Sequence, residues 1–294
     1  MRFAVLFAAG FFACAAAAAV QSPQEKWKAS LADDNKDWAA APHAILKIQD
    51  AAYLGEGQSA TLVGIKGKPE SWHWVSGMSA AGVLSASVKA GHPVVVKDGK
   101  TYSDAQIAKG IAVDADVDIA GAQTQVNAGV IGARLFVFNQ KNAAAKEFKG
   151  VDFYPYDPSY VVTARFAPDS HLTPRAFRTS RGTDKQFFHA GDVGFALQGR
   201  TFTLPVYADS NEPSKIASFA AFFTDGLTGK ETYGSGRYVD IDGFGKFPPK
   251  TVAIDFNYAY NPNCSRSKFF TCPIATDNLS MDVKVGERDP HVAH

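Results

Sequence analysis

Apolar and polar residues alternate over short stretches through the first half of the chain, and turn residues separate these stretches. The pattern is clearest at 84–88, 93–97, 100–102, 113–119 and 134–139. Because successive side chains on a strand point to opposite faces, the stretches predict short β-strands. The pair Asp98-Gly99 separates two of them and is typical of a tight hairpin turn.

The second half of the chain continues this pattern with longer connectors rich in Gly and Pro. The predicted strands are 161–166, 201–208, 218–224, 237–241, 252–260 and 279–285. Turn signals at this spacing favour an antiparallel sandwich or barrel. We therefore predict a mostly β protein.

One segment, 24–38, has a helical period instead. Trp27, Leu31 and Trp38 fall near one face, and Ser22-Pro23 can start the helix. We expect this N-terminal helix to pack as an arm on the first β domain.

The string GVDFYPYDP at 150–158 concentrates prolines and aromatic residues between the two groups of strands. It predicts a joint between two β domains. We place the N-terminal helix and a β-sandwich at 20–150, and a C-terminal antiparallel β-barrel or sandwich at 151–290.

Residues 1–19 have the pattern of a secretory signal peptide. Arg2 precedes an apolar run and an alanine-rich end, which predicts cleavage near Val20 and a secreted or periplasmic protein. A lipoprotein anchored at Cys14 is the alternative. The apolar run is short for a membrane span, and we expect no transmembrane segment in the mature chain.

Charge and motifs exclude several functional classes. The chain has 30 Lys and Arg against 29 Asp and Glu, a net charge of +1, which does not favour nucleic acid as a partner. No G-x-S-x-G, Walker loop or dinucleotide fingerprint occurs. The Asp row at 114, 116 and 118 predicts a solvated strand face, with calcium binding as the alternative. We predict no cofactor and no metal site.

Two of the three cysteines, Cys264 and Cys272, lie in the mature chain. In an exported protein, two cysteines predict one disulfide, which would stabilise the fold by roughly 2–3 kcal/mol. A metal pair or a redox pair is the alternative.

The segment 251–287 concentrates unusual polar residues. On a strand from 252, one face is bulky and apolar or aromatic, whereas the other carries Asp255 and Asn257 between alanines. Small neighbours leave space around the polar groups, which suits a binding pocket. The candidate binding residues are Arg237, Asp255, Asn257, Tyr260, Asn261, Asn278 and Glu287.

Two interpretations of this constellation remain open. In the first, Asp255 acts as a base, Arg237 holds an anionic group, and Asn257 and Asn261 bind a carbonyl or sugar hydroxyls. In the second, the residues are structural. Arg237 then pairs with Asp255 or Glu287, and the Asn side chains cap loop backbone.

Several strings resemble a known family. GLTGKETYGSGRYVDI at 226–241, IDFNYAYNPNC at 254–264, TCP at 271–273 and the final GE resemble the bacterial and archaeal domain-of-unknown-function family numbered 1684. The string FKGVDFYPYDPSYVVTARF at 148–166 is similar to its middle segment. The resemblance implies a first part similar to forkhead-associated β-sandwiches and a second part with the signature, and it implies no activity. Phosphopeptide readers of the forkhead-associated type bind their ligand with an Arg, a Ser and an Asn on loops. We find no such set of loop residues between Leu62 and Phe138.

The sequence leaves enzymatic activity undecided. We expect an exported small-molecule-binding or accessory module. One alternative is a cofactor-independent hydrolase with Asp255 or Glu287 as general base. Another is an envelope module that binds a protein partner through its first domain.

Overall fold

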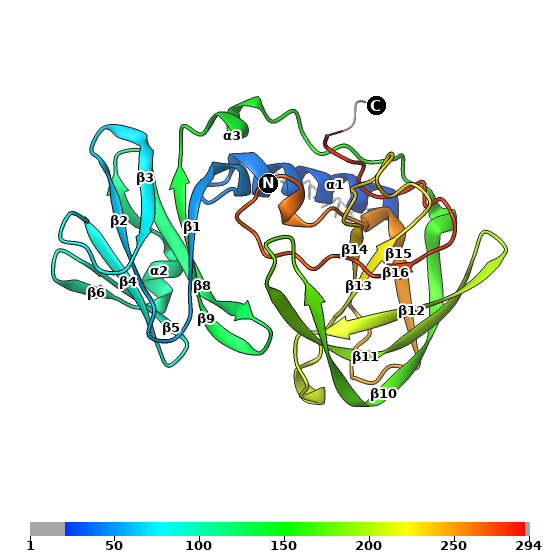
Figure 1. Cartoon of the computed structure of the whole chain (residues 1–294). Coiled ribbons are helices and arrows are strands. Elements are labelled where there is room, and N and C mark those ends of the chain that lie inside the picture. Colours follow the sequence, from blue (N-terminus) through cyan, green and yellow to red (C-terminus); the bar gives the residue numbers. More distant parts are fainter. Residues whose placement is uncertain (1–20, 292–294) are drawn as a thin grey trace, which may run out of the picture.

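The computed structural model describes residues 21–291 and shows a mostly β protein (Figure 1). The leader expected at residues 1–19, including Cys14, lies outside these residues. No helix of the described part is long and apolar enough to cross a membrane.

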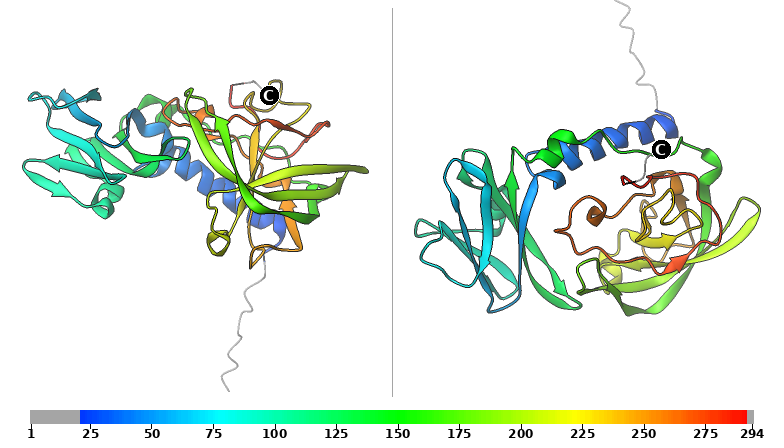
Figure 2. Two further views of the ribbon diagram at one scale, coloured as in Figure 1. Left: turned by 60° about the horizontal axis from the view of Figure 1, so that its bottom comes forward. Right: turned by 45° about the horizontal axis from the view of Figure 1, so that its top comes forward.

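The N-terminal helix is α1 (Pro23–Asn35), followed by a π-helical turn, η1 (Lys36–Ala40). Ser22 and Glu25 form a capping box that satisfies free backbone amides at its start. Its buried Trp27 donates from Nε1 to the carbonyl of Asn257 at 3.0 Å. The helix therefore packs on the C-terminal unit (Figures 1 and 2), and the expected arm on the first β domain is wrong.

Two antiparallel sheets form the first β unit. One contains β1 (Ile48–Leu54), β9 (Val130–Asn139), β8 (Val117–Asn127) and β7 (Ile111–Asp114) in that order. The other contains β3 (Lys68–Ser76), β2 (Ser59–Ile65), β4 (Leu84–Lys89), β5 (His92–Lys97) and β6 (Lys100–Tyr102). Leu62 and Leu135, one from each sheet, are fully buried in a common core. The sheets therefore form the expected sandwich.

In this unit the predicted hairpin turn is confirmed and one predicted strand is wrong. Asp98 and Gly99 both have positive φ, +52° and +73°, as the predicted hairpin turn requires. The predicted strand 113–119 is wrong, because a turn between β7 and β8 interrupts it. Two aspartates of the row have cationic or ionisable partners, since Asp116 contacts Lys141 and Asp118 contacts His43.

The C-terminal unit is a seven-stranded sheet that curves into a half-barrel (Figure 1). Its strands, in order, are β14 (Arg237–Ile241), β13 (Phe219–Thr224), β12 (Arg200–Ala208), β11 (Asp184–Leu197), β10 (Val161–Arg178) and β15 (Thr251–Asp255). The short strand β16 (Asp277–Asn278) pairs in parallel with β13. The strand β11 was not predicted. Phe219, Ile254 and Phe256 are among the core residues.

Short helices connect these elements. They are α2 (Asp104–Lys109), α3 (Ala143–Glu147), η2 (Ile45–Lys47), η3 (Pro158–Tyr160), η4 (Pro213–Lys215), η5 (Phe256–Tyr258) and η6 (Asn263–Ser265). The segment 24–38 is thus the longest helix of the described residues but not their only one.

Two predicted strands near the candidate site are wrong for identifiable reasons. The strand 252–260 ends at Asp255, whose carboxylate accepts from the Asn257 amide and starts the turn η5. The segment 279–285 forms no strand, since β16 ends just before it at Asn278. Its Val283 and Val285 carbonyls accept from the Arg237 guanidinium instead of from a neighbouring strand. Side-chain burial there still alternates, since Val283 and Val285 are buried and Asp282 is exposed.

Candidate functional site

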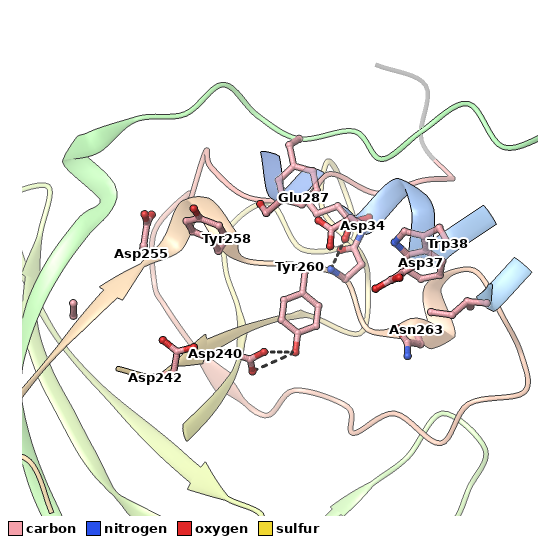
Figure 3. Close-up of a pocket in the computed structure, with 15 residues that line it drawn as sticks. Asp34, Asp37, Trp38, Asp240, Asp242, Asp255, Tyr258, Tyr260, Asn263 and Glu287 are labelled. Atoms are coloured by element: carbon pink, nitrogen blue, oxygen red, sulfur yellow. Dashed lines mark hydrogen bonds between the residues drawn. The ribbon is translucent and has the colours of Figure 1, made fainter. Parts of the chain in front are cut away.

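A pocket of about 700 Å³ lies where α1 and η1 meet the ends of β14 and β15 and the loop after β15 (Figure 3). Four of the seven residues proposed from the sequence line it: Asp255, Tyr260, Asn261 and Glu287. The helix α1 contributes Ser30 and Asp34, and the turn η1 contributes Asp37 and Trp38. The pocket is therefore assembled from segments far apart in the sequence.

Six carboxylates border this pocket, and we call them the acidic set. They are Asp34, Asp37, Asp240, Asp242, Asp255 and Glu287. Figure 3 shows Asp34 and Asp37 on the helical side, opposite Asp240 and Asp242 at the end of β14. Among the described residues that line the pocket there is no Lys, Arg or His. The pocket is consequently a region of negative potential.

Aromatic side chains supply part of the pocket wall, namely Trp38, Phe153, Tyr258 and Tyr260. The Tyr260 hydroxyl donates to both carboxylate oxygens of Asp240, at 3.1 and 3.3 Å (Figure 3). Burial raises the pKa of the Asp240 carboxyl, and the hydrogen bond from Tyr260 opposes this shift. Burial also raises the pKa of Tyr260, so this hydroxyl remains a donor.

Glu287 is the most deeply buried member of the acidic set, with a side chain 2% exposed. Its carboxylate accepts from Arg266 at 2.5 Å and from the backbone amide of Asn261 at 2.7 Å. Burial raises the pKa of Glu287, and the positive charge of Arg266 opposes this. The Arg266 guanidinium also lies 4.5 Å from the centre of the Trp38 ring.

Asn261 has one polar atom without a partner. Its Nδ2 donates to the Arg288 carbonyl at 2.8 Å, but no described residue donates to its buried Oδ1. The residue is 1% exposed. A buried acceptor without a donor costs about 1–3 kcal/mol, and such atoms in native proteins call for an explanation.

Arg237 does not line the pocket. Its side chain is 1% exposed, and Nη2 pairs with the fully buried Asp225 at 2.5 Å. The expected pairing with the carboxylate of Asp255 or Glu287 is therefore wrong. The sequence did not indicate Asp225 as the partner of Arg237, because Asp225 follows β13 and lies outside the polar segment 251–287. With its donors directed at Asp225 and the carbonyls of 283 and 285, Arg237 holds the C-terminal segment in place.

Asn257 and Asn278 also lie outside the pocket lining. Asn257 is 1% exposed and joins Asp255 to the backbone of Asp157, with contacts of 2.7 to 2.9 Å. Asn278, on β16, is exposed and donates to Thr224 Oγ1 at 2.8 Å. Asn257 thus fixes the position of the Asp255 carboxylate rather than facing a ligand.

Most of the residues that line the pocket were missed from the sequence, among them Asp34, Asp37, Trp38, Asp240 and Asp242. A signal was available for some of them. The helix carries the acidic run at 33–37, and Asp240 and Asp242 flank Ile241 with the two-residue spacing that places both on one face. Neither signal shows by itself that these segments meet.

The two cysteines are neighbours near this site. Both are free thiols, and the Cys264 amide lies 3.3 Å from the Cys272 sulfur. A hydrogen bond from Cys272 lowers the pKa of Cys264 to about 7. The loop between them carries Arg266. Within residues 21–291, no three His, Cys, Asp or Glu side chains are grouped so that they could hold a metal ion.

Comparison with known proteins finds a family model that matches part of the chain, and this model carries no activity. Residues 146–288 match the family model DUF1684, described as a protein of unknown function. The solution NMR structure of an uncharacterized protein from Haloarcula marismortui shares 26% identity and covers 49% of this chain and 79% of its own, with a TM-score of 0.41. No curated protein matches the chain.

Proposed function

We propose that this chain, whose residues 146–288 belong to the DUF1684 family, is an exported small-molecule-binding module with its site in the pocket beside α1. The pocket itself carries the proposal. Its volume of about 700 Å³ is within the range of about 300–1,000 Å³ usual for ligand sites. Aromatic walls and convergent polar groups are the other usual features of such sites.

The hydrogen bonds of the pocket support binding over catalysis. Asp255 and Glu287, the two carboxylates considered as a general base, both already accept hydrogen bonds from fixed donors. These hydrogen bonds hold each carboxylate in one orientation and occupy oxygen lone pairs that a general base would need. Fixed polar groups around an open pocket suit recognition of a ligand that is not transformed.

A substitution that fills the pocket with a large side chain tests whether the pocket binds a small molecule. Ala253 lies on β15, is exposed and lines the pocket, so Ala253→Trp should occupy the space without entering the core. We expect native mass spectrometry of the mature protein from its exporting cell to show a retained small molecule that the variant lacks. Ala196→Trp is the control, since Ala196 is an exposed alanine on β11 away from the pocket. A retained molecule equally abundant in both variants would contradict the proposal.

Export and a disulfide form a second part of the proposal. In an oxidising compartment, the neighbouring Cys264 and Cys272 would join and fix the loop that carries Arg266. The same mass spectrum should show a chain that begins near Val20 and lacks two hydrogens relative to the reduced form. An unprocessed chain with two free thiols, isolated without reductant, would refute this part.

A further inference from the structure

We infer that the pocket binds an organic cation with ammonium groups, because it combines the acidic set, an aromatic wall and the unpaired buried acceptor of Asn261. The inference rests on the proposed binding function and specifies its ligand class.

The first argument is charge. Glu287 is neutralised by Arg266, Asp240 accepts from Tyr260, and Asp255 accepts from Asn257. The side chains of the remaining three, Asp34, Asp37 and Asp242, accept no hydrogen bond from the described residues, although the charge of Arg266 also acts on Asp34. Asp34 and Asp37 repel each other on one side of the pocket, as Asp240 and Asp242 do on the other. All of them repel an anionic ligand, whereas a cationic group near either pair would lower its energy.

The second argument is independent of charge and comes from Asn261. Its Oδ1 is an acceptor only, so it can be satisfied only by a donor. Asn261 lines the same pocket as the acidic set. An ammonium group donates up to three hydrogen bonds and accepts none, which matches a site whose unmet requirement is for donors.

The third argument is that the protein already holds a cation beside this pocket. The Arg266 guanidinium lies over the Trp38 ring and pairs with Glu287. A cation over an aromatic ring gains roughly 0.5–2 kcal/mol, more where water is excluded. Tyr258, which is 36% exposed, offers a further ring in the same lining.

The dispersion of the carboxylates favours an organic cation over a metal ion. Carboxylate ligands of Ca²⁺ or Mg²⁺ lie about 2.0–2.6 Å from the ion and so crowd together. Among the described residues no group of three could do this. A flexible amine can instead place its charges near separate members of the set.

The experiment compares three probes with the same five-carbon length: 1,5-diaminopentane, 1,5-pentanediol and glutarate. Calorimetric titration of the mature chain should detect the diamine and neither of the others. In Asp37→Asn/Asp242→Asn, which keeps side-chain size but removes two charges, diamine affinity should fall at least about tenfold. Asp209→Asn, an exposed aspartate after β12, is the control and should leave affinity unchanged.

The outcomes separate the ligand class from the binding function. If the diol or glutarate binds, and Ala253→Trp abolishes that binding, the pocket is a site but the cation inference is wrong. Failure of the diamine to bind also overturns the inference, whatever the mass spectrum retains. Diamine binding that Ala253→Trp leaves intact would place the diamine elsewhere and refute the inference as well.

Discussion

Arg237 and Asp225 form a buried ion pair, and both partners are almost inaccessible to water. Removal of one member leaves the other charged and uncompensated. We expect Arg237→Met to lower the free energy of unfolding by about 3–5 kcal/mol. Urea denaturation measures this change.

An exposed ion pair offers a matched control for this prediction. Lys215 and Glu212 lie 2.6 Å apart, with side chains 63% and 56% exposed. Lys215→Met should cost at most about 1 kcal/mol, because solvent screens such pairs. A comparable loss in both variants would contradict the assigned role of Arg237.

The pKa values of the pocket carboxyls predict how cation binding depends on pH. Burial raises the pKa of Asp34, Asp240 and Glu287 above the ordinary 3.8 of Asp and 4.5 of Glu, although Arg266 opposes the shift at Asp34 and Glu287. A raised pKa means that each group becomes neutral at a higher pH during acidification. Attraction for a cation is then lost as pH falls through these raised values.

We therefore expect the affinity for 1,5-diaminopentane to fall on acidification from neutral pH, and to begin to fall above the ordinary pKa values of Asp and Glu. The amines stay protonated throughout, since their pKa values are about 10. Titrations at fixed ionic strength provide the measurement. Affinity that is constant or rises on acidification would show that ionised carboxylates do not hold the ligand.

At the scale of elements, α1 is attached to the C-terminal unit through Trp27. This residue packs against Phe153 and Tyr156, with ring centres 6.2 and 5.7 Å away, and donates to the Asn257 carbonyl. We expect Trp27→Ala to cost about 3–5 kcal/mol of stability. Because the helix carries Asp34, ligand binding should weaken too.

A smaller substitution separates the two effects. Trp27→Phe keeps most of the packing but loses the hydrogen bond, so it should cost about 0.5–1.5 kcal/mol and retain binding. Binding that survives Trp27→Ala unchanged would show that the helix is not a necessary wall of the pocket.

The elements that the sequence predicted correctly depend on local interactions. The strand 237–241 and the hairpin around Asp98-Gly99 are set by side-chain alternation and turn chemistry. The strand β11 was missed, since Gly191 and Gly194 interrupt its alternation. The end of β15 is set by a local contact between Asp255 and the Asn257 amide, which the strand pattern at 252–260 conceals. The irregular segment 279–285 depends instead on Arg237, far away in the sequence. No local pattern reveals such a partner.

The same division holds for the whole molecule. Asp255, Tyr260, Asn261 and Glu287 could be selected because one short segment contains them all. The opposite wall comes from α1 and η1, and its place depended on where Trp27 packs. The first β unit contacts the C-terminal unit through Gln125, whose side chain bonds the backbone of Gln186 in both directions at 2.9 Å.

The Trp27–Asn257 contact joins residues 230 positions apart. Chains are synthesised from the N-terminus at about 5–20 residues per second, so the tryptophan precedes its partner by on the order of 10–50 s. Such long-range contacts also form late during folding, because closing a large loop is entropically costly. The helix α1 can therefore pack only after nearly the whole chain has been synthesised. The pocket is complete, and able to bind a ligand, only in the fully synthesised and folded chain.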